Sequence, residues 1–135
     1  MSYKCKFFKI YELVDKETYE ARGEKAWELF DDRALKGLDM LREDLGPVTV
    51  NNWYWAGKFQ NRGLRTSKYY KGRVSYSQHT FGRAFDFDVK GMSAEQVRIH
   101  IRANHSKYGI TAIENGVNWV HADWRNCEPL KQFTP

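Results

Sequence analysis

Apolar residues recur at three- and four-residue steps through residues 16–45, the spacing that places side chains along one face of an α-helix. The members of this stripe are Trp27, Phe30, Ala34, Leu38, Leu41 and Leu45. Gly46 and Pro47 follow directly, and this pair ends a helix because proline cannot continue one. The pattern therefore predicts a long amphipathic helix over 16–45 with one buried face.

Further along the chain the pattern changes to the two-residue alternation of β-strands. Strands are predicted over 48–52 (VTVNN) and over 83–89 (RAFDFDV). The segment ITAIENGVNWVHADW contains two alternating runs separated by Asn115 and Gly116. Asn-Gly between two such runs is the strongest short-range signal for a hairpin with a two-residue turn.

Two other segments complete the predicted order of elements. Ser93 and Gln96 form a capping box that predicts a short helix over 93–104. Residues 53–77 form a long irregular stretch with seven Trp, Tyr and Phe residues, which argue against disorder and favour a functional loop. The order helix, strand, loop, strand, helix, hairpin predicts an α+β fold with a small antiparallel sheet and flanking helices.

Composition narrows the class of protein. A chain of 135 residues with 41% hydrophobic residues fits one globular domain spanning 1–135. Its net charge of +5 favours an acidic partner such as nucleic acid, anionic lipid or a cell-wall polymer. Cys5 and Cys127 are too few for a disulfide framework, although a pair joining the two ends and two separate thiols both stay open.

The N-terminal residues do not resemble a signal peptide, and the chain contains no apolar run long enough to span a membrane. We therefore expect a protein without a membrane partner that is made as a soluble cytoplasmic protein. We also expect a monomer. If it acts at the cell wall, another factor must release it.

Two histidines and one aspartate have the residue types of a catalytic metal site. His79 ends a polar turn, Asp86 follows on a predicted strand, and His121 lies on the last predicted strand. Such a set leaves one coordination position of a zinc ion open for water. On spacing alone, the alternative is a buried histidine beside a structural aspartate. His100 and His105 are not patterned with acidic residues and predict surface or packed positions.

The segment SQHTFGRAFD resembles the motif S-x-H-x-x-G-x-A-x-D of the zinc D-Ala-D-Ala carboxypeptidase family. The fixed positions of the motif correspond to Ser77, His79, Gly82, Ala84 and Asp86. The family includes phage L-alanyl-D-glutamate endopeptidases, and its distal histidine is matched by His121 in NWVHADW. The resemblance implies a hedgehog/D,D-peptidase-like fold and Zn2+ bound by His79, Asp86 and His121. It also implies a zinc metallopeptidase of phage or bacterial origin, of the carboxypeptidase or endopeptidase type, that cleaves peptidoglycan stems or cross-links.

One position departs from that family. Three residues before the distal histidine, the family usually has Glu or Asp, which takes a proton from the water at the zinc. Here the position is Asn118, and an amide cannot accept that proton. Other acids could replace it, in this order of preference: Asp123, Glu114 and Asp88.

Strand geometry sets the order of the first two acids. Asp123 shares the face of His121 at a distance of roughly 6–7 Å. A two-residue turn would place Glu114 roughly 13 Å from His121 along the ladder, which is too far unless the hairpin bends. The alternative for Asp123 is a structural salt bridge with Arg125 or Arg83.

The long loop could supply further parts of a site. The family has an arginine, in a Gly-aromatic-Arg context, that stabilises the developing oxyanion. The segment RGLR is similar but not identical, so Arg65 is the candidate and Arg62 the reserve. The loop's aromatic side chains could line a peptide groove or pack in a cluster of their own: Trp53, Tyr54, Trp55, Tyr69 and Tyr70.

The sequence leaves three alternatives to a zinc peptidase. A catalytically impaired zinc-bearing module that binds the cell wall is the main alternative, because of Asn118. Nucleic-acid binding by the basic, aromatic loop is set aside because the chain has no base-reading motif. Non-haem iron also uses two histidines and a carboxylate, but its second histidine is expected downstream of Asp123, where the chain has none.

Overall fold

The computed structural model describes residues 2–135. In chain order the elements are η1 (Ile10–Glu12), α1 (Lys16–Arg22), η2 (Gly23–Leu29), α2 (Asp32–Leu45), β1 (Val48–Thr49), η3 (Trp53–Trp55), β2 (Ala84–Val89), α3 (Ala94–Tyr108), β3 (Ala112–Glu114), β4 (Val120–Asp123) and β5 (Lys131–Phe133). The three elements marked η are short 3-10 helices. The predicted α+β class is confirmed.

The five strands form one sheet in the order β1-β2-β4-β3-β5. Neighbouring strands are antiparallel except β3 and β5, which run parallel. The prediction of an antiparallel sheet is therefore wrong at this edge, where the sheet is mixed. β5 was not predicted, because three residues are too few to show a periodic pattern.

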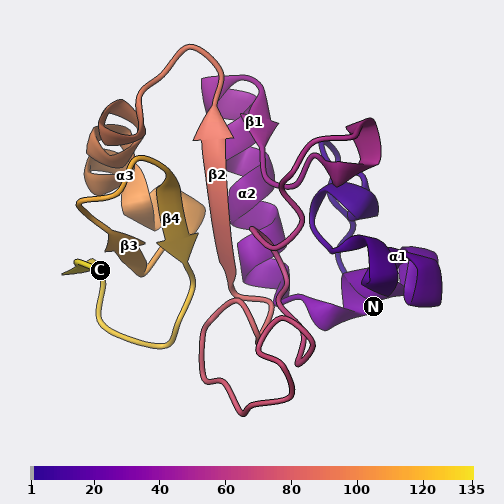
Figure 1. The fold of residues 1–135 in the computed structure, drawn as a ribbon. Helices are drawn as coiled ribbons and strands as arrows, with labels where there is room; N and C mark the ends of the chain where they lie inside the picture. The colour runs from indigo at the N-terminus through magenta and orange to yellow at the C-terminus, as the bar shows by residue number, and fades with distance from the viewer. Residues whose placement is uncertain (1) are drawn as a thin grey trace.

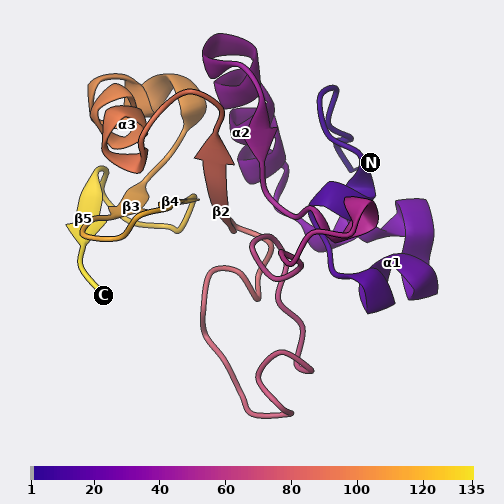
Figure 2. The ribbon, with the colours of Figure 1, turned by 45° about the horizontal axis from the view of Figure 1, so that its top comes forward.

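Strand alternation separates the sheet into a core face and a site face. On β2, Phe85 and Phe87 belong to the hydrophobic core, while Asp86 between them points to the other face. On β4, Val120 and Ala122 flank His121 in the same way, so the polar residues of both strands share one face. Figure 1 and Figure 2 show α2 and α3 together on the core face.

The long helix predicted over 16–45 is broken into α1, η2 and α2. Its stripe of apolar residues is buried as predicted, apart from the partly buried Leu45. The first break falls at Gly23, which has a positive φ of 54°, and the second falls at Phe30, whose backbone is extended (φ −111°, ψ 149°). The Asp31 carboxylate then caps α2 by accepting from the backbone N–H of Arg33. The stripe survives because each short helix can present its own apolar side chains to the core.

The hairpin is paired in a different register from the one predicted. Ala112 pairs with Asp123 and Ile113 with Ala122, so a connection over 115–119 replaces the two-residue turn. The backbone N–H of Asn115 donates to the carbonyl of Phe133 on β5 (2.7 Å). Asn115 is thus bound to β5, and the chain turns back only after it, within the connection over 115–119.

The predicted start of α3 is confirmed, and the structure decides between the alternatives left open for the two cysteines. The capping box of Ser93 and Gln96 is formed, and α3 continues four residues beyond the predicted end to Tyr108. Cys5 and Cys127 are separate free thiols. Among residues 2–135, the helices are all too short or too polar to cross a membrane.

Candidate metal centre

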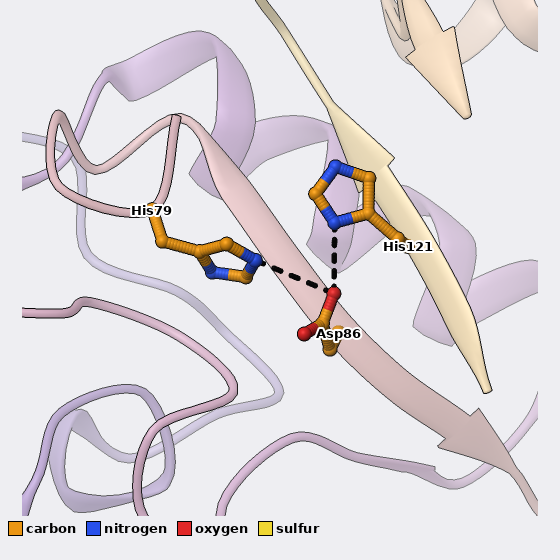
Figure 3. Close-up of side chains that lie close together, drawn as sticks. All are labelled: His79, Asp86 and His121. Atoms are coloured by element: carbon orange, nitrogen blue, oxygen red, sulfur yellow. Dashed lines mark hydrogen bonds and ion pairs between the residues drawn. The ribbon is translucent and has the colours of Figure 1, made fainter. Parts of the chain in front are cut away.

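Three side chains converge on the site face of the sheet. Asp86 on β2 and His121 on β4 are cross-strand partners, and His79 reaches them from the turn before β2 (Figure 3). The Asp86 Oδ1 atom lies 2.8 Å from His121 Nδ1 and 3.3 Å from His79 Nε2. One ligand atom from each residue lies within 4.8 Å of the others, and all three residues are buried. This group could hold a metal ion.

The turn before β2 determines how His79 faces the centre. Its backbone N–H donates to the hydroxyl of Ser77 (3.3 Å), and its Nδ1 lies 2.8 Å from the carbonyl of Gly63. Because a carbonyl only accepts, Nδ1 carries the proton and Nε2 is the free ligand atom. Gly82 has φ +66°, and a Cβ there would lie 2.7 Å from the Cα of Phe30. The motif glycine therefore permits close packing of this turn against the chain before α2.

His121 is oriented by a contact of its Nε2 atom, the ring nitrogen that does not face Asp86. Its Nε2 lies 2.8 Å from Asp123 Oδ2, which leaves Nδ1 facing Asp86. Asp123 is fully buried, and Arg125 binds both of its oxygens, at 2.8 Å from Nε and 2.6 Å from Nη2. A carboxylate on the far nitrogen of a metal-binding histidine fixes the ring and its tautomer. Both imidazoles can therefore offer a lone pair to one cation.

The three acids considered as proton acceptors occupy different places. Asp123 is on the far side of the His121 ring and does not line the pocket that contains the three candidate ligands. Glu114 lines this pocket together with His121. The two-residue turn on which the predicted distance rested is absent. Among residues 2–135, the Glu114 carboxylate has no hydrogen-bond or ion-pair partner. Asp88 is bound by Arg62 at 3.0 Å and lines a neighbouring cavity.

The two arginines of the segment RGLR also differ. Arg65 Nη2 lies 3.1 Å from Asp86 Oδ2, and Arg65 Nε donates to the carbonyl of Asn61 (2.8 Å). Its guanidinium lies over the ring of Tyr69, and the side chain lines the pocket of the candidate ligands. Arg62 is directed to Asp88 and lines only the neighbouring cavity. Of the two arginines of this segment, Arg65 is therefore the one at the centre.

Electrostatics of the centre favour a cation. Burial alone would raise the pKa of Asp86, but hydrogen bonds from His121 and His79 outweigh it and hold that pKa well below its usual range. Burial alone would lower the pKa of His121, but its bonds to Asp123 and Asp86 raise it to about 9. Without a metal, His121 is thus an imidazolium between two carboxylates. A divalent cation can take over the positive charge that this proton supplies.

Open space lies on two sides of Asp86. A pocket of about 370 Å³ contains the candidate ligands, and a cavity of about 450 Å³ adjoins it, sharing Asp86 and Trp119. The aromatic walls of the pocket were not predicted: Tyr76, Trp119 and Phe133. Local sequence patterns could not group these three residues, because they come from segments that are far apart in the sequence.

The aromatic residues predicted to line a groove lie elsewhere. Tyr54 stacks on Tyr11 with ring centroids 3.8 Å apart, and Trp53 and Trp55 pack beside them. These three residues of η3 line neither of the two spaces beside Asp86. They cluster with Tyr11 of η1, so neither a peptide groove nor a cluster formed by the loop alone describes them.

The chain matches no protein-family model, no curated protein and no solved structure. The chemistry of the centre and the motif that surrounds it are therefore the features that bear on its function.

Proposed function

We propose that this protein is a zinc metallopeptidase with a hedgehog/D,D-peptidase-like fold that cleaves peptide stems or cross-links of bacterial peptidoglycan. The observation that carries the proposal is the buried group His79, Asp86 and His121, whose ligand atoms lie within 4.8 Å of one another. Further support comes from the surrounding motif. Ser77 and Gly82 have structural roles in the turn that presents His79, which accounts for their positions in it.

Zinc is the proposed metal because two imidazoles and one carboxylate form the ligand set of catalytic zinc sites. When bound, zinc would polarise the scissile carbonyl and make water a better nucleophile near neutral pH. The ligand atoms would be Nε2 of His79, Nδ1 of His121 and a carboxylate oxygen of Asp86, the atoms that their hydrogen-bond partners leave facing the centre.

We assign the role of general base to Glu114 in this proposal. It is the acid that lines the pocket without being one of the three ligands. It is half-buried and unpaired among residues 2–135, so its oxygens are free to accept a proton from the attacking water. Asp123 is less suited to this step, because Arg125 and His121 already occupy its oxygens.

Arg65 would stabilise the negative charge that develops on the carbonyl oxygen of the substrate. Its guanidinium is already at the centre through Asp86, and a guanidinium stays charged and donates in fixed directions. An unchanged rate in the variant Arg65→Ala would move this role to Arg62 or remove it from the loop.

A second function is favoured by one observation. Asn118 stands where the resemblance calls for an acid, and it lines the cavity beside Asp86. If Glu114 does not replace that acid, the protein is a zinc-bearing module that binds the cell wall without cleaving it.

Metal analysis and mass spectrometry of digested peptidoglycan test the proposal together. We expect about one zinc per chain, and loss of zinc in His79→Ala and Asp86→Ala because each removes a ligand. His105→Ala, on α3 and outside the centre, is the control and should keep the metal. Peptide fragments should appear with zinc and disappear with a chelator.

Two outcomes would count against the proposal in different ways. Stoichiometric zinc in a double variant of His79 and His121 would show that zinc is not bound at this centre. A zinc-loaded protein that releases no fragment from peptidoglycan, but sediments with it, would support the non-catalytic module.

A further inference from the structure

The positive charge of the chain is concentrated in one segment. Residues 45–85 contain no Asp or Glu but seven basic residues: Lys58, Arg62, Arg65, Lys68, Lys71, Arg73 and Arg83. Because the net charge of the whole chain is +5, the rest of the chain has more acidic than basic residues. The same segment provides the turn that bears His79 and one wall of the metal pocket.

Ion pairs neutralise only part of this charge. Arg62, Arg65 and Lys68 are paired with Asp88, Asp86 and Glu17, respectively. In the sequence, Lys71 and Arg73 lie between these paired residues and the turn that bears His79. Neither has a carboxylate partner among residues 2–135. Two cations only two positions apart in the sequence, without carboxylate partners, attract an anionic partner.

Exposed apolar side chains accompany these two cations. The basic loop, residues 66–81, extends beyond β2 and away from the helices and the sheet (Figure 2). Val74 and Tyr76 are each 81% exposed, and Tyr69 and Phe81 are nearly half exposed. Exposed aromatic and basic side chains grouped on one protruding segment are typical of an interaction surface.

The loop is continuous with the metal pocket. Tyr76, Ser77 and Gln78 belong to it and also line the pocket that contains the candidate ligands. A polymer whose side branch enters the pocket must therefore pass close to the basic loop. This continuity favours a partner that carries the ligand of the metal site over an unrelated one.

We infer that the basic loop is a docking surface for the peptidoglycan polymer whose peptide enters the metal pocket. This inference rests on the proposed function. Lys71 and Arg73 attract the free carboxylates of neighbouring stem peptides, and the exposed rings pack against the apolar faces of sugar units. The loop thereby holds the polymer while the short pocket binds one peptide.

Sedimentation with purified peptidoglycan, stripped of phosphate-bearing polymers, tests the loop. The test variant is Lys71→Asp with Arg73→Asp, since aspartate tolerates the positive φ (+54°) of Lys71. The control is Lys4→Asp with Lys6→Asp, which makes the same change in charge at two exposed positions near the N-terminus. We expect binding about tenfold weaker in the loop variant and a smaller dependence on salt, with the control within about twofold of the wild type.

The expected kinetic signature is a selective one. Cleavage of a soluble single muropeptide should stay within about twofold of the wild-type rate in the loop variant, whereas cleavage of intact peptidoglycan should fall about tenfold. Zinc content and circular dichroism check that the variant is folded. If Glu114→Gln abolishes cleavage, this background is used for sedimentation so that the polymer stays intact.

Several results would overturn the inference. Unchanged sedimentation of the loop variant, an equal loss in the control, or loss of binding on removal of the phosphate-bearing polymers would each do so. If the protein binds a single-stranded oligonucleotide more tightly than it binds peptidoglycan, and if this binding depends on salt and on the loop, the loop is a nucleic-acid surface instead. If no muropeptide is cleaved but charge-dependent sedimentation remains, the catalytic proposal fails and the docking surface stands.

Discussion

At the scale of single residues, the two histidines of the centre face it with different nitrogens. His79 offers Nε2 because the carbonyl of Gly63 accepts from Nδ1, and His121 offers Nδ1 because Asp123 holds Nε2. The partners that fix the tautomers thus matter as much as the rings themselves. Asp123 contacts the His121 ring and Glu114 lines the pocket, so substitution can distinguish the separate roles proposed for them.

Glu114→Gln should keep zinc and the fold but lower turnover by a factor of about 10²–10⁴, the usual contribution of a general base. Asp123→Asn should instead weaken zinc binding by a factor of about 10–100, because the His121 ring loses its charged partner. The measurements are kcat at saturating zinc and the zinc dissociation constant. If Asp123→Asn loses turnover at saturating zinc while Glu114→Gln remains active, the base is Asp123.

At the scale of elements, the turn before β2 connects the metal centre to the packing of the N-terminal half. The backbone N–H of Asp31 donates to the carbonyl of Gly82 (3.0 Å), next to the break between η2 and α2. The same turn presents His79 only a few residues away. Disturbing the turn should therefore affect stability and metal binding together.

Gly82→Ala should lower the free energy of unfolding by more than the roughly 1–2 kcal/mol that a left-handed backbone costs a non-glycine residue. The added Cβ would also collide with the carbonyl of Leu29 and lie 2.7 Å from Phe30 Cα. Gly72→Ala is the matched control, with φ +78° and no atom within 4 Å of an added Cβ. Urea unfolding and zinc titration measure both effects. Equal destabilisation of the two variants would contradict the proposed role of close packing.

At the scale of the whole molecule, the proposed metal binding would be coupled to stability through protonation of the buried centre. In the metal-free protein, the pKa of His121 is raised from 6.5 to about 9. Its contribution to stability is therefore fully present below pH 6.5 and lost as the pH rises through 9. The pKa values of Asp86 and Asp123 are lowered, so their contributions are present above about pH 4 and lost in acid.

The metal-free protein should therefore be most stable between about pH 4 and 6.5. Zinc should reverse the trend above this window, because it binds the neutral imidazole and its affinity rises as His121 loses its proton. Urea unfolding across a pH series, with chelator or with excess zinc, measures both curves. A metal-free protein that gains stability from pH 6.5 to 9 would contradict an imidazolium held between the two carboxylates.

The sequence by itself determined the features that depend on local spacing. Alternation assigned Asp86 and His121 to the polar faces of their strands, and the motif spacing selected His79 as their partner. The capping box of Ser93 and Gln96 likewise located the start of α3. These features follow from backbone periods and short-range hydrogen bonds, which a few neighbouring residues are enough to specify.

Only the tertiary structure decided which acid faces the centre. Asn115 carries a strong turn signal, but its backbone N–H donates to the carbonyl of Phe133. The hairpin is paired in a different register, and Glu114 lines the pocket with His121. The place of Asp123 behind the His121 ring likewise depends on Arg125 and on burial. Strand pairing and burial of charge are set by contacts between distant segments, which compete with local preferences and here outweigh them.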